Sequence, residues 1–229
     1  MTDQRDKIIG KLKTALNRES RSTDEARARL VTPPINLIPE RGDDSSTDKI
    51  NRFINEAEKV EATVEKIASI EDLPASAAAY MAAHNLPMRI RVAASLSGAP
   101  WAGQPLLTMS SGIADGSDVI GISRAFGAVA ETGTLVFLSG PDNPTTINFL
   151  PPNHIAVIAA DEIAGNYERV WQRIRSAWPQ TQTAPGKTDL PRTVNWITGP
   201  SRTADIEQTL LLGIHGPQRL HIVVVDDVK

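Results

Sequence analysis

Residues 155–160 read Ile155-Ala156-Val157-Ile158-Ala159-Ala160, and this uninterrupted apolar run indicates the fold more clearly than any other stretch. Strands that are buried on both faces have such runs, because helices cover both sides of their sheet. An amphipathic segment follows directly. Its apolar side chains recur at helical spacing, and they are Ile163, Tyr167, Val170, Trp171, Ile174 and Trp178. A buried strand that leads into an amphipathic helix is the repeating unit of a parallel α/β sheet.

Shorter apolar segments repeat this pattern along the chain. We expect further strands at residues 60–67, 89–94, 118–122, 134–138, 193–198 and 220–225. Helices are expected at residues 50–57, 74–84 and 204–212. The alternation predicts an α/β fold with one open, mainly parallel sheet covered by helices. We expect segments 193–198 and 220–225 to be among its inner strands.

The N-terminal part has a different character. Ile8, Ile9, Leu12 and Leu16 share one face of a predicted helix. The residues that follow are polar and contain several prolines, which is typical of an extended arm. We therefore predict a helix and a proline-containing arm over residues 1–46, and one α/β domain over residues 47–229.

Composition and charge argue against several classes of function. A net charge of −3 and a pI near 5.8 provide no field that would gather phosphate backbones, so no nucleic-acid partner is expected. The sequence has no apolar stretch of the length that a membrane helix needs. Its first residues are too polar for a secretory signal. We expect a cytoplasmic protein without a membrane segment.

The chain contains no cysteine. Iron–sulfur clusters are usually held by thiolates, so we expect this chain to bind no cofactor of that kind. Its four histidines lack metal-ligand spacing, and no metal site is expected. The glycine fingerprints of dinucleotide-binding and nucleotide triphosphate-binding loops are absent as well. Any redox chemistry is therefore expected in a bound cofactor or on another chain.

The strongest local signal for a ligand site is WITGPSRTADIE at residues 196–207. We expect a strand to end before this turn and a helix to begin after it. The N–H groups at a helix start can bind a carboxylate or a phosphate, and an arginine lies beside them. The candidate ligand-binding residues here are Gly199, Ser201, Arg202, Thr203, Asp205 and Glu207. The same pattern also fits capping alone, by Ser201 or Thr203, with Asp205 favouring the helix dipole.

Two further motifs hold candidate catalytic residues. In AETGT at residues 130–134, Glu131 precedes a glycine turn, where a carboxylate can act as a base or a nucleophile. Its neighbours Thr132, Gly133 and Thr134 are candidate ligand contacts, although a purely structural turn would have the same sequence. His154 precedes a buried strand and is the second candidate. We predict that Glu131, His154 and the turn at residues 201–203 border one cleft. A histidine at a strand entrance can instead bond a backbone carbonyl.

Three segments together resemble the LUD domain of the lactate utilization protein C family. They are AETGTLV at residues 130–136, LPPNHI at residues 150–155, and GPSRTADIE at residues 199–207, which continues to GIHGP at residues 213–217. The resemblance covers roughly residues 47–226. It implies an open α/β sheet like that of sugar-phosphate isomerases and CoA transferases, with an N-terminal helical extension.

The same resemblance implies participation in the conversion of L-lactate to pyruvate, beside partner proteins that carry iron–sulfur clusters. The lack of cysteine fits a cluster-free subunit of such a system. A subunit of this kind would bind a small carboxylate such as lactate or pyruvate through Arg202, or would only dock its partners. The alternatives are an independent isomerase or acyl-transfer enzyme that uses Glu131, and a small-ligand sensor.

Overall fold

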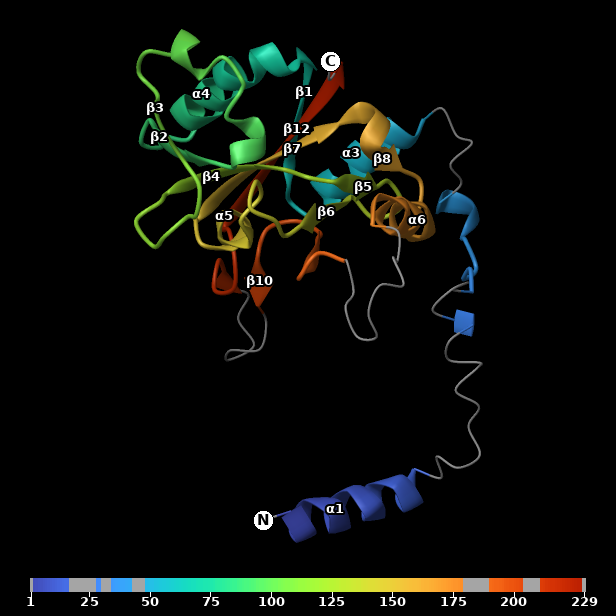
Figure 1. Cartoon of the computed structure of the whole chain (residues 1–229). Coiled ribbons are helices and arrows are strands. Elements are labelled where there is room, and N and C mark those ends of the chain that lie inside the picture. The colour runs from blue at the N-terminus through green and yellow to red at the C-terminus, as the bar shows by residue number, and fades with distance from the viewer. Residues whose placement is uncertain are drawn as a thin grey trace. The chain divides into compact units, whose positions relative to one another are not determined.

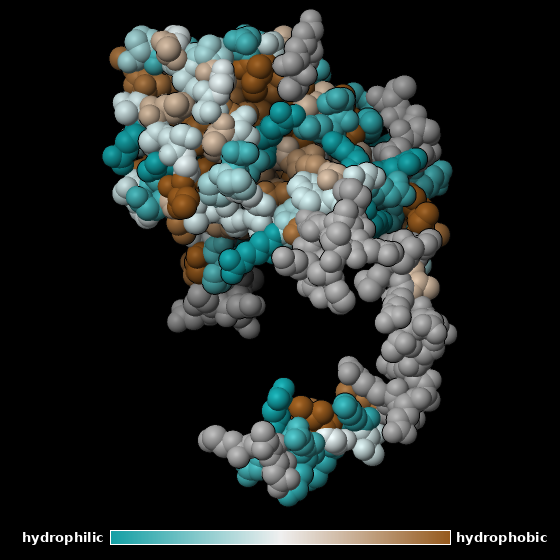
Figure 2. Space-filling model, viewed as in Figure 1, coloured by the Kyte–Doolittle hydropathy of each residue, from teal (hydrophilic) through white to brown (hydrophobic). Residues whose placement is uncertain are grey.

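The computed structural model describes residues 2–16, 28–29, 34–42, 48–178, 190–203 and 211–227. The chain forms two compact units, Met1–Leu37 and Ile38–Lys229. The first unit contains helix α1 (Thr2–Ala15), which confirms the predicted N-terminal helix. Ile8 and Leu12 on α1, and Leu16 after it, are more than half exposed, and Figure 2 shows hydrophobic side chains along one side of this helix. Residues 38–42 belong to the second unit, which holds the α/β domain.

The main sheet has six strands, and every neighbouring pair is parallel. In spatial order they are β1 (Thr63–Ser69), β12 (Arg219–Asp227), β7 (Asn153–Ala159), β4 (Ile120–Arg124), β2 (Arg89–Val92) and β3 (Thr108–Ser111). The apolar segment at residues 155–160 forms most of β7, a central strand whose seven residues are all buried. The predicted parallel α/β sheet is confirmed, as is the inner position of residues 220–225 in β12.

A second sheet of four strands packs on the main sheet. Its order is β8 (Ile163–Ala164), β5 (Gly127–Val129), β6 (Thr134–Leu138) and β9 (Val194–Ile197). Strands β5, β6 and β9 pair antiparallel, whereas β5 and β8 pair parallel. The prediction that residues 193–198 form an inner strand of the main sheet is wrong, because β9 is an edge strand of this second sheet. Its residues are all only partly buried, as expected for a strand that is covered on one side.

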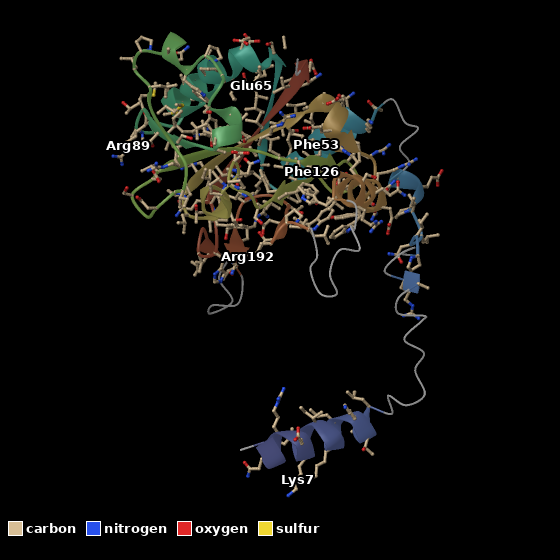
Figure 3. The ribbon with its side chains drawn as sticks, viewed as in Figure 1. Lys7, Phe53, Glu65, Arg89, Phe126 and Arg192 are labelled. Carbon is tan, nitrogen blue, oxygen red and sulfur yellow. The ribbon has the colours of Figure 1, made fainter. Side chains whose placement is uncertain are left out.

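Helices cover the faces of the two sheets that do not pack against each other, and α3 lies beside the second sheet (Figure 1). Helix α4 (Leu73–Ala83) covers one face of the main sheet, and its residues pack with Val223 and Val225 of β12. Helix α3 (Lys49–Lys59) and the second sheet cover the other face, where Phe53, labelled in Figure 3, packs against Ile222. Helix α6 (Tyr167–Ala177) covers the outer face of the second sheet. The helices predicted at residues 50–57 and 74–84 are thereby confirmed.

The remaining elements are short. Helix α5 spans Thr145–Phe149, and single 3-10 turns occur at Glu40–Gly42, Ile70–Asp72, Ala94–Leu96, Trp101–Gly103 and Ala160–Glu162. Strands β10 (Arg202–Thr203) and β11 (Leu211–Leu212) pair antiparallel. The prediction of a helix over residues 204–212 is therefore wrong for residues 211 and 212, which form β11. The segment 204–210 lies outside the described residues. None of the helices in the described ranges is long and apolar enough to cross a membrane.

Candidate functional site

The three sequence segments that carry candidate residues meet near the edge of the main sheet where β1, β7 and β12 begin. We call this the amino edge. Ser201 N donates to Pro217 O at 2.8 Å, and Gln218 N donates to Pro152 O at 2.8 Å, so the segment around residue 201 is joined to the segment before His154. Thr134 Oγ1 lies 2.7 Å from Thr198 Oγ1, which joins the first segment to the third. The structure therefore brings the three segments together.

The sequence predicts that Arg202 lies beside the start of a helix, but the structure places it in a strand. It begins β10, and its guanidinium donates to Val60 O, just after α3, and lies 3.6 Å from the Glu61 carboxylate. Gly199 has a φ of +73°, and a Cβ there would lie 2.5 Å from Val60 O. The turn at residues 199–202 thus closes against the end of α3, and none of the described residues 199–203 belongs to a helix.

The other candidates of this segment have structural contacts or fall outside the described part. Ser201 Oγ accepts a hydrogen bond from His215 N at 3.3 Å, and Ser201 O accepts one from Gly213 N at 3.0 Å. These bonds hold the start and the end of the β10–β11 pair together. Thr203 pairs with Leu211 in that ladder. Asp205 and Glu207 lie outside the described residues.

Glu131 lies in the turn between β5 and β6, and its side chain is only 8% exposed. Its Oε1 accepts a hydrogen bond from Arg41 Nε at 3.1 Å, and its backbone N donates to Gly165 O at 3.1 Å. Asn166 Nδ2 donates to Gly42 O at 2.7 Å and fixes the same piece of chain beside Glu131. A substrate that approached this carboxylate would therefore have to compete with Arg41.

A cluster of four hydroxyl groups lies next to Glu131. Thr132 Oγ1 lies 2.7 Å from Thr134 Oγ1 and 2.9 Å from the Tyr167 hydroxyl, and Thr134 also contacts Thr198. We call these four residues the hydroxyl cluster. Sequence reasoning named Thr132 and Thr134 but missed Tyr167 and Thr198. Tyr167 gave only the signal of a helical apolar face, and its hydroxyl partners are 33 and 35 positions away.

His154 lies at the start of β7 and points into the core between the two sheets. It is 1% exposed, and its Nε2 lies 2.8 Å from Ser123 Oγ. The Ser123 hydroxyl donates to Asn148 Oδ1 at 2.7 Å, so its oxygen accepts from the N–H of His154. His154 Nδ1 has no hydrogen-bond partner in the part of the chain that the structure describes. Burial lowers the pKa of His154 to about 3, so the ring is neutral at physiological pH.

These environments do not form the single cleft predicted for Glu131, His154 and the turn at residues 201–203. Glu131 contacts Arg41, whereas His154 contacts Ser123 and lies beside the Phe137 ring with 5.3 Å between centroids. Ser201 and Arg202 contact residues that precede β1 and β12. The segments are neighbours, but their candidate side chains point to different surroundings. The roles proposed for them as catalytic and ligand-binding residues stay predictions.

Two hollows lie near the carboxyl ends of the main strands. One, of about 320 Å³, is lined by Arg124 at the end of β4, by Glu162, and by Trp178. The other, of about 650 Å³, lies along α6 and β8. Phe126 lines both hollows. Open parallel sheets bind ligands beyond the carboxyl ends of their strands, so both hollows lie where a ligand of this fold would bind.

Arg124 Nη2 lies 2.9 Å from Glu162 Oε1, and this ion pair is partly buried. Sequence reasoning proposed no site residue in either hollow, because their lining residues come from several separate parts of the chain and form no local motif. Over the described residues, no group of three or more His, Asp or Glu side chains is arranged to hold a metal ion.

Comparison with known proteins agrees with the resemblance seen in the sequence. Residues 113–225 match the model of the LUD domain family. The chain is 37% identical over 108 residues to lactate utilization protein C from Geobacillus sp. (strain WCH70), an alignment that covers 47% of this chain and 42% of that protein. The protein of the same name from Bacillus subtilis (strain 168) is 32% identical over 108 residues, again 47% of this chain and 42% of the relative. The matched region thus spans less than half the length of these relatives.

A solved structure supports the fold. The crystal structure of a DUF162 family protein from Deinococcus radiodurans superposes with a TM-score of 0.50 and covers 78% of this chain and 96% of that chain. The sequence identity is 19%, so this likeness concerns the fold alone.

Proposed function

We propose that the chain acts in L-lactate utilization, because residues 113–225 match the model of the LUD domain family and 108 residues are 37% identical to a lactate utilization protein C. In this proposal it is the cluster-free component of a system that oxidises L-lactate to pyruvate. The iron–sulfur clusters are carried by partner proteins, as the family resemblance implies. The protein works in the cytoplasm and holds its partners or their substrate rather than transferring electrons itself.

The observation that carries the proposal is the family match, which runs through the recognised segments at residues 130–136, 150–155 and 199–217. The complete lack of cysteine supports the cluster-free role, because thiolates are the usual ligands of iron–sulfur clusters. A lactate-oxidising system needs a redox centre, so the partner proteins have to provide it.

The amino edge offers a contact for the carboxylate of lactate or pyruvate. Arg202 shares its guanidinium between Val60 O and Glu61, and Glu61 is 61% exposed. An ion pair with so exposed a carboxylate contributes little, so a substrate carboxylate can replace Glu61 at low cost. A guanidinium offers several N–H groups in one plane, which allows it to keep the bond to Val60 O at the same time.

The test is genetic and biochemical. Deleting the gene in the native host should abolish growth on L-lactate while leaving growth on pyruvate unchanged, and expression of the chain from a plasmid should restore it. An affinity-tagged chain should co-purify with cysteine-rich partners that have the absorption of iron–sulfur clusters. Normal growth of the deletion strain on L-lactate would refute the proposed role.

A further inference from the structure

The larger hollow has the composition of a binding site for an organic anion. It measures about 650 Å³ and is lined by Lys49 at the start of α3, by Arg169 and Arg173 of α6, by Ile163 and Ala164 of β8, and by Phe126. Three separate elements therefore contribute to it, and none of the recognised family segments does. The hollow lies next to the carboxyl ends of β4 and β7, on the side of the sheet where ligands bind in open parallel folds.

Positive charge dominates the rim. Among the described residues that line the hollow, Lys49, Arg169 and Arg173 are cationic and Asp161 is anionic, so these residues together carry a charge of +2. The net charge of the whole chain is −3, and the positive rim is therefore a local departure from the protein's overall charge. Arginine and lysine are the residues that bind phosphate and carboxylate groups, arginine often through two parallel hydrogen bonds.

Part of this rim is held rigidly in place. Arg173 Nη1 donates to Glu162 O at 2.6 Å, Nη2 donates to Phe126 O at 3.4 Å, and the guanidinium lies 5.6 Å from the centre of the Phe126 ring. Arg169 precedes Arg173 by one helical turn, so both side chains project from the same side of α6. An anion that enters the hollow therefore meets two cations on one side of α6, of which Arg173 is fixed by its backbone contacts.

The floor of the hollow is apolar. Ile163 is 1% exposed and Ala164 is 6% exposed, and Phe126 adds an aromatic wall. Gln172 and Ser176 of α6 supply hydrogen-bonding groups at the rim. Binding sites for small organic molecules combine an apolar lining with a few polar groups in this way, at volumes of about 300–1,000 Å³. A three-carbon acid such as lactate would leave most of this space empty.

We propose that this hollow binds an organic anion of nucleotide size, whose flat ring lies against Phe126, above the buried Ile163 and Ala164, and whose phosphate groups meet Lys49, Arg169 and Arg173. The site is distinct from the amino edge, and the proposal does not depend on the role in lactate utilization. It assigns to the chain a ligand that neither its family segments nor its sequence fingerprints reveal.

Calorimetric titration of the full chain with ADP tests the proposal, with adenosine and pyrophosphate as separate arms for the ring and the charge. ADP should bind, and each fragment should bind at least about tenfold more weakly, because one charged hydrogen bond alone changes affinity by that amount. The double variant Lys49→Gln/Arg169→Gln should weaken ADP binding at least about tenfold. Arg173 is left unchanged, since its backbone contacts stabilise the fold.

Arg175→Gln is the matched control, because Arg175 lies on the same helix but outside the hollow. It should leave ADP binding unchanged, and thermal melting should show that all variants are folded. No binding of ADP below about 1 mM would overturn the proposal. An equal loss in the control variant, or an unchanged affinity in the double variant, would overturn it as well. Growth on L-lactate is measured separately, so the two proposals fail independently.

Discussion

Thr134 Oγ1 lies 2.7 Å from Thr198 Oγ1, although the two residues are 64 positions apart in the chain. This contact links the start of β6 to the residue after β9 and closes the hydroxyl cluster around Tyr167. Thr134 is fully buried, so the loss of its hydroxyl leaves the partly buried hydroxyl groups of Thr132 and Tyr167 with fewer partners. The cluster therefore acts as a structural brace between two recognised segments.

We expect Thr134→Val to lower the free energy of unfolding by about 1–3 kcal/mol, the cost of leaving buried polar groups unsatisfied. Valine keeps the shape and the strand preference of threonine, so the loss reports on the hydroxyl. Thr145→Val is the control, because its hydroxyl makes only an exposed contact of 3.4 Å with Thr193. Urea denaturation of both variants gives the comparison. Equal midpoints for Thr134→Val and the parent would show that the cluster contributes nothing.

Gly133 occupies a position that no other residue can take without strain. Its φ is +65°, and a methyl group added to it would overlap the backbone of Ala57 in α3. We expect Gly133→Ala to destabilise the protein by about 2–4 kcal/mol, from the unfavourable backbone angle together with the clash. Gly140→Ala should change stability by less than about 1 kcal/mol, since nothing lies within 4 Å of its added carbon. A similar loss in both variants would contradict this account.

The sequence predicted the main sheet well for a physical reason. Strands β7 and β12 are buried on both faces, so their sequences are continuous apolar runs that are easy to recognise. The second sheet was harder. Strand β5 has only three residues, and four residues separate it from β6, too few for the crossover that parallel strands need. The short gap could have indicated an antiparallel pair and thus a separate sheet.

The candidate site was predicted less completely. The sequence identified segments that do meet in space, but not where their side chains point. His154 faces a buried serine and Arg202 faces the end of α3, and neither direction follows from a local motif. The charged hollow along α6 was missed because Lys49 lies far in the sequence from Arg169 and Arg173, and these residues form no local motif.

His154 should make stability depend on pH. Burial holds its pKa at about 3, below the usual 6.5, so the unfolded chain binds a proton between these values that the folded chain does not. The contribution of His154 to the free energy of unfolding is therefore fully present above pH 6.5. It decreases as the pH falls toward 3, by up to about 1.4 kcal/mol per pH unit.

His154→Gln removes the titrating ring and can still donate to Ser123. We expect a smaller slope of unfolding free energy against pH in this variant, measured by urea denaturation between about pH 4.5 and 7. Some slope should remain, because burial also lowers the pKa of His221. His215→Gln, a change at an exposed position, is the control. An unchanged slope in His154→Gln would mean that the histidine ring is not the group responsible.

Arg202 is the candidate contact for a substrate carboxylate at the amino edge. If it takes that role, Arg202→Ala should weaken lactate or pyruvate binding by about 1.5–3 kcal/mol, the range for hydrogen bonds to charged groups. Calorimetric titration of the purified chain measures this change. Arg192→Ala, at an exposed position, should have no effect. Equal affinity of the Arg202→Ala variant and the parent would remove this residue from the proposed site.

The last prediction concerns the chain by itself. Electron transfer from lactate requires a redox centre, and a chain without cysteine lacks the usual ligands for an iron–sulfur cluster. It also lacks the glycine fingerprint of dinucleotide-binding domains. We therefore expect the purified protein to be colourless and inactive toward L-lactate with artificial electron acceptors. Activity should appear when the cluster-bearing partners are added, and it should rise with this chain until the partners are saturated. Absorption spectra and dye-reduction rates provide the measurements. Sustained turnover by the isolated chain, after removal of metals and flavins, would contradict the cluster-free accessory role and would assign the oxidation to its own residues.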